Sequence, residues 1–200
     1  MGTKIFSWRA AQLLGSLVFF LTLAACGGGT SGTATPTPTP SPVATNLTTY
    51  TGDGYQIGYP QSWKVNQGSA GLVTFSDPQG IAYMAIHVAP NPNGTIPATS
   101  QVDLGLQAFK SQATNYQKLD IAATTSVGGD TWSQGAATGD VKPAGQPSPV
   151  PAKIIVIADN HPANDLSTRS FSIGYATGQQ VFDLANTGYF QPMLQSFKFV

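Results

Sequence analysis

Five consecutive apolar residues, Ile154 to Ala158, constrain the fold of this chain more than any other feature. A strand with one face in water alternates apolar and polar side chains, whereas a strand covered on both faces is apolar at every position. The run therefore predicts a central strand of a sheet that carries packed layers on both sides.

Other segments have the pattern of shorter strands. Gly128-Gly129-Asp130 separates two of them and predicts a hairpin. The Gly- and Pro-rich stretch from Asp140 to Pro151 is expected to be a long mobile hairpin loop. The remaining expected strands are Tyr55–Tyr59 (stopped by Pro60), Leu72–Phe75, Ile81–Val88, Thr124–Val127, Thr131–Ala137 and Phe171–Thr177.

Two segments have the apolar spacing of amphipathic helices. The first is expected to begin at Ser100 as its N-cap residue and to bury one face between Val102 and Ala113. The second lies near the C-terminus, around Tyr189 to Leu194. A sheet with a strand buried on both sides and two such helices implies an α/β (α+β) sandwich, with the helices on opposite faces of the sheet.

The first 26 residues have the three-part pattern of a secretory signal. Lys4 and Arg9 form a basic start, and the segment from Ala10 to Ala25 has no charge. Its apolar core is about 11 to 14 residues long, shorter than the ~20 that span a bilayer. The run Leu-Thr-Leu-Ala-Ala-Cys, which ends at Cys26, resembles the lipobox of bacterial lipoproteins, in which the cysteine is lipidated and begins the mature protein.

This resemblance implies that residues 1–25 are a lipoprotein signal peptide. Acyl chains on Cys26 would then anchor the protein to the extracytoplasmic face of a bacterial cell membrane, and two or three chains anchor durably where one does not. A plain cleaved signal peptide and an uncleaved membrane anchor are the alternatives. Because Cys26 is the only cysteine in the chain, no disulfide is expected.

The rest of the chain divides by composition. Residues 26–49 are rich in Gly, Thr and Pro and have no charge, so they are expected to form a disordered tether. Residues 50–200 have the size of one globular domain. Without the signal peptide the chain has seven basic residues against nine aspartates, a net charge of −2, and no basic patch. Nucleic-acid binding is therefore not expected.

Three motifs of the domain resemble PsbP-like proteins. Gly54 to Val65 contains an aromatic strand followed by Tyr-Pro-x-x-Trp, ending at Trp63. Val73 to Pro78 is similar to the next strand and turn of that family, and Phe190 to Phe199 to its closing helix and Ser-Phe-x-Phe tail. The resemblance implies an antiparallel sheet sandwiched between helices, in a family of mostly non-enzymatic binding and assembly proteins.

Few residues in the domain suggest chemistry. His87 is expected to be a packed or edge histidine of a strand. Asp159, His161 and Asp165 lie in one polar segment and are weak candidates for ligands of a divalent cation, although such residues are also typical of a solvated loop. No catalytic residues and no cofactor are expected, because neither a nucleophile motif nor a phosphate-binding loop occurs.

Three functions are compatible with these features. The leading hypothesis is a lipid-anchored extracytoplasmic binding or assembly module without catalytic activity, whose partners are the membrane and an envelope protein. The second is a small-ligand or ion-binding lipoprotein. The third, ranked below both, is a hydrolase, which would require aspartate or histidine groups to converge in one cleft.

Overall fold

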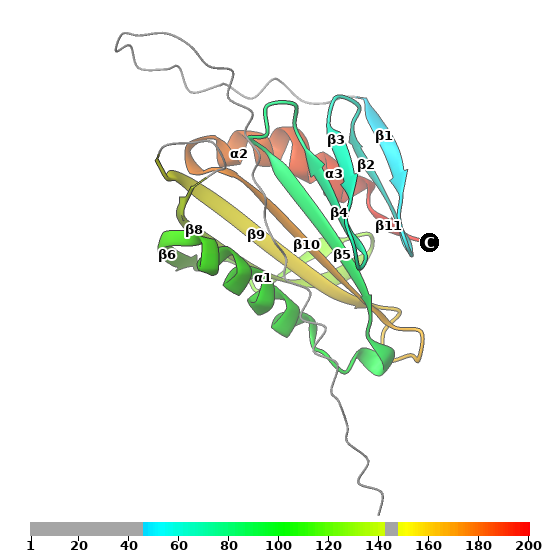
Figure 1. The fold of residues 1–200 in the computed structure, drawn as a ribbon. Coiled ribbons are helices and arrows are strands. Elements are labelled where there is room, and N and C mark those ends of the chain that lie inside the picture. Colours follow the sequence, from blue (N-terminus) through cyan, green and yellow to red (C-terminus); the bar gives the residue numbers. More distant parts are fainter. Residues whose placement is uncertain (1–45, 143–147) are drawn as a thin grey trace, which may run out of the picture.

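The computed structural model describes residues 46–142 and 148–200. The expected signal peptide, Cys26 and most of the expected tether lie outside the described residues, as does part of the loop expected between Asp140 and Pro151. The described chain forms two antiparallel sheets with helices packed against them, which confirms the mixed α/β (α+β) sandwich (Figure 1).

The larger sheet has eight antiparallel strands in the order β3-β4-β5-β10-β9-β8-β6, with β7 paired to β8. Most of its strands follow one another as hairpins, so sequence neighbours are often spatial neighbours. The strands are β3 (Lys64–Gln67), β4 (Leu72–Ser76), β5 (Tyr83–Pro90), β6 (Ala113–Leu119), β7 (Thr124–Val127), β8 (Asp130–Val141), β9 (Val150–His161) and β10 (Arg169–Gly178).

Strand β9 contains the apolar run and lies between β10 and β8, so the predicted central strand is confirmed. Its side chains alternate between two cores. Ile154, Val156 and Ala158 belong to one core, and Ile155 and Ile157 pack in the other. The unbroken apolar sequence is thus the consequence of two buried faces.

Helix α1 (Ala98–Gln112) covers one face of the large sheet. Val102, Leu106 and Phe109 are its buried apolar residues, as the spacing predicts. The helix lies close to the sheet at Gly105, where a Cβ atom would be 2.8 Å from Cγ1 of Val156. This core is therefore thin and built mostly from aliphatic side chains.

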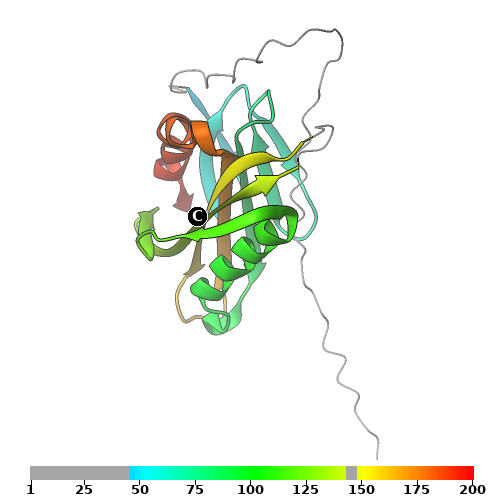
Figure 2. The same ribbon diagram turned by 90° about the vertical axis from the view of Figure 1, so that its left-hand side faces the viewer.

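The opposite face is covered by the C-terminal helices and the smaller sheet (Figure 2). The helical segment runs through η2 (Gln179–Val181), α2 (Phe182–Ala185), η3 (Asn186–Phe190) and α3 (Gln191–Ser196). Its core is rich in aromatic side chains, and Trp63 packs there against Tyr189 and Phe190. The prediction of helices on opposite faces is confirmed.

The smaller sheet has the order β1-β2-β11, formed by β1 (Leu47–Thr51), β2 (Tyr55–Pro60) and β11 (Lys198–Phe199). Its strands come from both ends of the described chain, β1 and β2 from the start and β11 from the C-terminus. Residues 47–49, which were expected to belong to the tether, pair with β2, so the folded part begins at Leu47 rather than at residue 50. Tyr50 explains the difference, because its ring packs on Phe75 and holds β1 against the core.

Helix α1 differs from the prediction at both ends. It begins at Ala98 with Pro97 in the N-cap position, rather than at Ser100, because the Pro97 carbonyl accepts the hydrogen bonds of the first turn. It ends at Gln112, so Ala113 is the first residue of β6 rather than part of the helical face. Among residues 46–142 and 148–200, no helix has the length and hydrophobicity needed to cross a membrane.

Candidate functional site

Asp159 and His161 are the last inward-facing residues of β9 on the aromatic side of the sheet. They are two positions apart, and side chains at this spacing share a face of a strand. Ile155 and Ile157 precede them on the same face and pack in the aromatic core. The polar pair thus extends an apolar row to the point where the strand leaves the core.

Asp130 joins this pair from the hairpin between β7 and β8. The register pairs Ser133 with Ala158, so continuing both strands by three residues brings Asp130 level with His161. Gly128 and Gly129, both at positive φ, form the tight turn that starts β8 at Asp130. Two neighbouring strands therefore deliver three polar side chains to one place.

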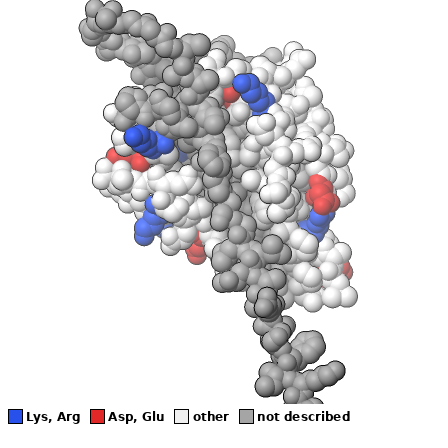
Figure 3. Space-filling model, in the orientation of Figure 1, with Lys and Arg blue, Asp and Glu red and all other residues white. Residues whose placement is uncertain are grey.

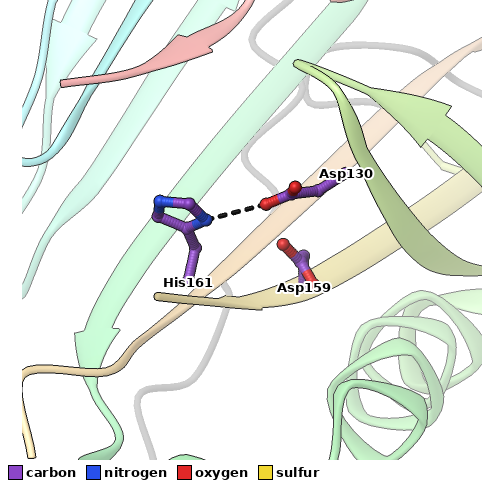
Figure 4. Close-up of side chains that lie close together, drawn as sticks. All are labelled: Asp130, Asp159 and His161. Atoms are coloured by element: carbon purple, nitrogen blue, oxygen red, sulfur yellow. Dashed lines mark hydrogen bonds and ion pairs between the residues drawn. The ribbon is translucent and has the colours of Figure 1, made fainter. Parts of the chain in front are cut away.

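The three side chains converge in space (Figure 4). Nδ1 of His161 is 2.7 Å from Oδ2 of Asp130, which is a short hydrogen bond or ion pair. One nitrogen or oxygen atom from each of Asp130, Asp159 and His161 lies within 4.8 Å of the others. The side chains of His161 and Asp130 are 36% and 41% exposed, so the cluster opens to solvent.

Asp159 is partly buried and has one fully enclosed carboxylate oxygen, Oδ2. Its carboxyl group accepts a hydrogen bond from the backbone N–H of Asn160, whereas its buried Oδ2 has no hydrogen-bond partner among the described residues. Burial raises the pKa of the Asp159 carboxyl, and the nearby negative charge of Asp130 raises it further. The hydrogen bond from Asn160 and the charge of His161 act in the opposite direction.

An aromatic floor supports the cluster. The imidazole of His161 stacks on the ring of Phe199, with 3.7 Å between centroids and 3° between planes. Phe199 in turn stacks on Trp132, whose Nε1–H donates a hydrogen bond to the carbonyl of Val127. The ring of His161 is therefore held in one plane with Nδ1 directed at Asp130.

Asn160 lies between Asp159 and His161 in sequence and points to the opposite face. Its Oδ1 accepts hydrogen bonds of 2.9 Å from Asn91 and from Gln101 of α1. Its Nδ2 donates to the carbonyl of Ile96 at 2.9 Å. This amide cluster (Asn91, Gln101 and Asn160) ties the start of α1 to the end of β9.

Asp165 does not join Asp159 and His161, so it is not part of the expected ligand group. Its Oδ1 accepts hydrogen bonds from the backbone N–H and the hydroxyl of Ser167, which lower the pKa of the Asp165 carboxyl. The loop between β9 and β10 folds back on itself here and carries Asp165 away from the cluster. Asp165 therefore stabilises the turn through its hydrogen bonds with Ser167.

The remaining predicted sites lie elsewhere. Cys26, the predicted lipidation site, lies outside the described residues, so its acylation stays a prediction. His87 lies half-buried on β5, where it pairs with Leu72 and Ser172 of the neighbouring strands. Burial lowers the pKa of its imidazole, and a hydrogen bond involving the backbone of Ala70 partly offsets this.

Sequence reasoning missed Asp130 as a member of the cluster, because an aspartate beside two glycines is typical of a turn. One signal was present in the sequence. Asp130 directly precedes the predicted strand Thr131–Ala137 and is two residues from Trp132, so the two side chains share a face if the strand begins one residue earlier. A hairpin between that strand and Ile154–Ala158 would bring this face beside Asp159 and His161. The length of the intervening loop left the register undetermined.

No protein-family model and no curated protein sequence matches the chain. Several solved structures resemble it in fold, including the following two. A protein of Bacteroides thetaiotaomicron VPI-5482 aligns with 74% of this chain at a TM-score of 0.46 and 7% identity, and the chain spans 45% of that protein. LpqN, which is involved in cell envelope biogenesis of Mycobacterium tuberculosis, aligns with 76% of this chain and 90% of its own at a TM-score of 0.45 and 10% identity. The PsbP-like assignment stays a prediction from the sequence motifs.

Proposed function

We propose that the protein is a lipid-anchored extracytoplasmic module that binds or assembles with an envelope protein and has no catalytic activity. The observation that carries this proposal is the Leu21–Cys26 motif at the end of an apolar signal segment. The uncharged residues between Cys26 and Leu47 support it, because such a segment provides reach between a membrane surface and a folded domain.

The folded domain supports a binding role through its surface. The face seen in Figure 3 carries few, scattered charged side chains. A surface of this kind recognises a protein through shape, hydrogen bonds and apolar contacts rather than through long-range steering by charge. The PsbP-like motifs support a binding role only through the resemblance itself, because Pro60 and Trp63 have structural positions: the Trp63 N–H donates to the Pro60 carbonyl, and Trp63 lies in the core.

Mass spectrometry of the full chain expressed in a lipoprotein-processing bacterium tests the anchor. We expect a product that begins at Cys26 and carries a diacylglyceryl group on the sulfur. The Cys26→Ala variant should lack the adduct, whereas Thr30→Ala, a change in the same segment, should retain it. An unmodified Cys26 or an intact Met1 in the parent protein would contradict the proposal.

Crosslinking in intact membranes, followed by affinity capture, tests the binding role. We expect a defined protein partner with the parent chain and reduced yield when Thr35–Pro42 is deleted, because the shorter tether reaches less far. The deletion should leave lipidation of Cys26 intact, which separates reach from anchoring. Recovery of the monomer alone would contradict a binding or assembly role.

The cluster of Asp130, Asp159 and His161 favours one alternative, an ion-binding lipoprotein. Its donor atoms lie within 4.8 Å of one another and include an enclosed carboxylate oxygen without a hydrogen-bond partner among the described residues. This alternative shares the lipid anchor of the leading proposal and differs in what the domain binds. It does not require catalysis.

A further inference from the structure

We propose that Asp130, Asp159 and His161 bind a divalent transition-metal cation of the zinc type, through one oxygen of each carboxylate and Nδ1 of the imidazole. The inference gives the ion-binding alternative its ligand residues and its class of ion. It does not depend on the lipid anchor, so either can fail without the other.

The donor set selects the class of ion. Two carboxylates and one imidazole nitrogen are typical ligands of zinc and of neighbouring transition metals. Calcium takes six to eight oxygen ligands, and magnesium prefers oxygen atoms and water, so neither matches a site with a nitrogen donor. Two carboxylates also balance the charge of a divalent cation while the imidazole is neutral.

The distances require only a small adjustment. Metal–ligand bonds of about 2.0–2.2 Å place the donor atoms of a tetrahedral site about 3.3–3.6 Å apart. The separation of 2.7 Å between His161 and Asp130 is shorter than this, and the limit of 4.8 Å for the whole group is longer. Rotation of the partly exposed Asp130 side chain would lengthen the short separation from His161, and small movements of the other two side chains would bring the remaining separations, which are all within 4.8 Å, to this range.

The Oδ2 atom of Asp159 gives the second, independent observation. A buried carboxylate oxygen without a partner costs free energy, and such atoms are uncommon in folded proteins. The hydrogen bond between His161 and Asp130 explains the positions of those two residues but leaves this oxygen unsatisfied. Because one oxygen of Asp159 lies within 4.8 Å of the donor atoms of Asp130 and His161, a cation bound between the three side chains would place a positive charge beside this incompletely paired carboxyl group.

The site is also accessible and partly preorganised. The partial exposure of His161 and Asp130 gives an ion a route from solvent. The stacking of His161 on Phe199 fixes the plane of the imidazole, as supporting contacts do for metal-binding histidines. Three protein ligands leave at least one position for water or for a group from a binding partner.

Calorimetry and thermal melting with zinc chloride test the proposal on the full chain in detergent micelles. The chain carries Cys26→Ser, so that no thiol competes for zinc. We expect one zinc ion per chain and a melting temperature that rises with zinc concentration, since a ligand that binds only the folded state stabilises it. Calcium and magnesium should bind more weakly than zinc.

Asp130→Asn, Asp159→Asn and His161→Gln should each weaken zinc binding about tenfold or more. Asp165→Asn is the matched control, because it removes the same charge from the nearby loop and should change the affinity less than about twofold. Circular dichroism establishes that each variant is folded. The proposal is overturned if the folded parent binds no zinc up to about 1 mM, if Asp165→Asn weakens binding as much as the three ligand variants, or if calcium binds as tightly as zinc.

Discussion

The end of β9 carries two polar clusters that face opposite sides of the sheet and differ in how well they are satisfied. On the α1 side, Asn160 exchanges three hydrogen bonds of 2.9 Å with its neighbours. On the aromatic side, Asp159 keeps an enclosed oxygen without a hydrogen-bond partner among the described residues. The two residues are adjacent in sequence, so the difference arises from what each face packs against.

This difference is the reason for assigning a structural role to the amide cluster and for proposing a binding role for the carboxylate cluster. The amide cluster is complete, and its hydrogen bonds hold α1 against the sheet. The carboxylate cluster is incomplete and opens to solvent through Asp130 and His161. Buried polar groups that lack a partner in the protein are candidates for a ligand.

The largest effect is expected from removing the aromatic floor. Trp132 is fully buried, and its ring packs on Phe197 and Phe199 beneath the carboxylate cluster. Trp132→Ala should lower the free energy of unfolding by about 3–5 kcal/mol, because it leaves a large cavity. Urea denaturation measures the change. Leu184→Ala, at a half-exposed position of α2, should change the free energy of unfolding by less than about 0.5 kcal/mol. Equal losses of stability in the two variants would contradict the role of Trp132 as a core residue beneath the cluster.

The next prediction compares the two clusters directly. Asn160→Ala should destabilise the protein by about 1–3 kcal/mol, because it removes the acceptor of the buried Gln101 amide and one of the two acceptors of the Asn91 amide, which keeps the carbonyl of Ile96. Asp159→Asn should cost less than about 1 kcal/mol, since no hydrogen bond to Oδ2 is lost. Urea denaturation of both variants without added metal measures the difference. The reverse order would mean that the carboxylate, rather than the amide, holds the end of β9.

A smaller effect is expected on the thin side of the sandwich. In Gly105→Ala the new Cβ atom would lie 2.8 Å from Cγ1 of Val156, so the variant should lose about 1–2 kcal/mol. Gly178→Ala is the control, because its nearest contact would be an ordinary 3.7 Å. Combining Gly105→Ala with Val156→Ala should cost less than the sum of the two changes. Additive losses would show that the contact is not the cause.

The smallest effect is a dependence of stability on pH through His87. Its pKa is lowered in the folded state by burial, so the unfolded chain binds a proton more readily. As far as His87 is concerned, the free energy of unfolding should therefore have its full value above the ordinary histidine pKa of 6.5 and should decrease as the pH falls below it. Denaturation at about pH 7.5 and 5.5 measures the slope. His87→Gln should reduce the slope, and an unchanged slope would exclude His87 as its source.

The sequence predicted the elements whose side chains are buried. The apolar run of β9 and the alternation of β10 are patterns that burial imposes, whereas the hairpin between β7 and β8 was predicted from its turn residues. Strands β3 and β6 were missed, because they lie at the edges of the sheet and are mostly polar. Edge strands are held by backbone pairing, which leaves little trace in the sequence.

The candidate site was predicted in part. Asp159 and His161 were grouped because they are close in sequence, but they were expected in a polar loop after Ile154–Ala158. Strand β9 instead extends to His161, which places both side chains on one face of the strand. Asp130 comes from another strand, and its position depends on a register that the sequence did not fix. Asp165 was included by proximity in sequence, but the turn at Ser167 uses its carboxylate instead.

The position of β1 has a mechanical consequence. The chain enters the folded part at Leu47, at the open end of a hairpin in which Leu47 pairs with Pro60 and Thr51 with Gln56. Tension applied through the preceding residues would load this edge strand one rung at a time, as in unzipping, instead of shearing all its rungs together. Strand β1 would thus detach at low force and add its residues to the expected tether, while the eight-stranded sheet remains intact.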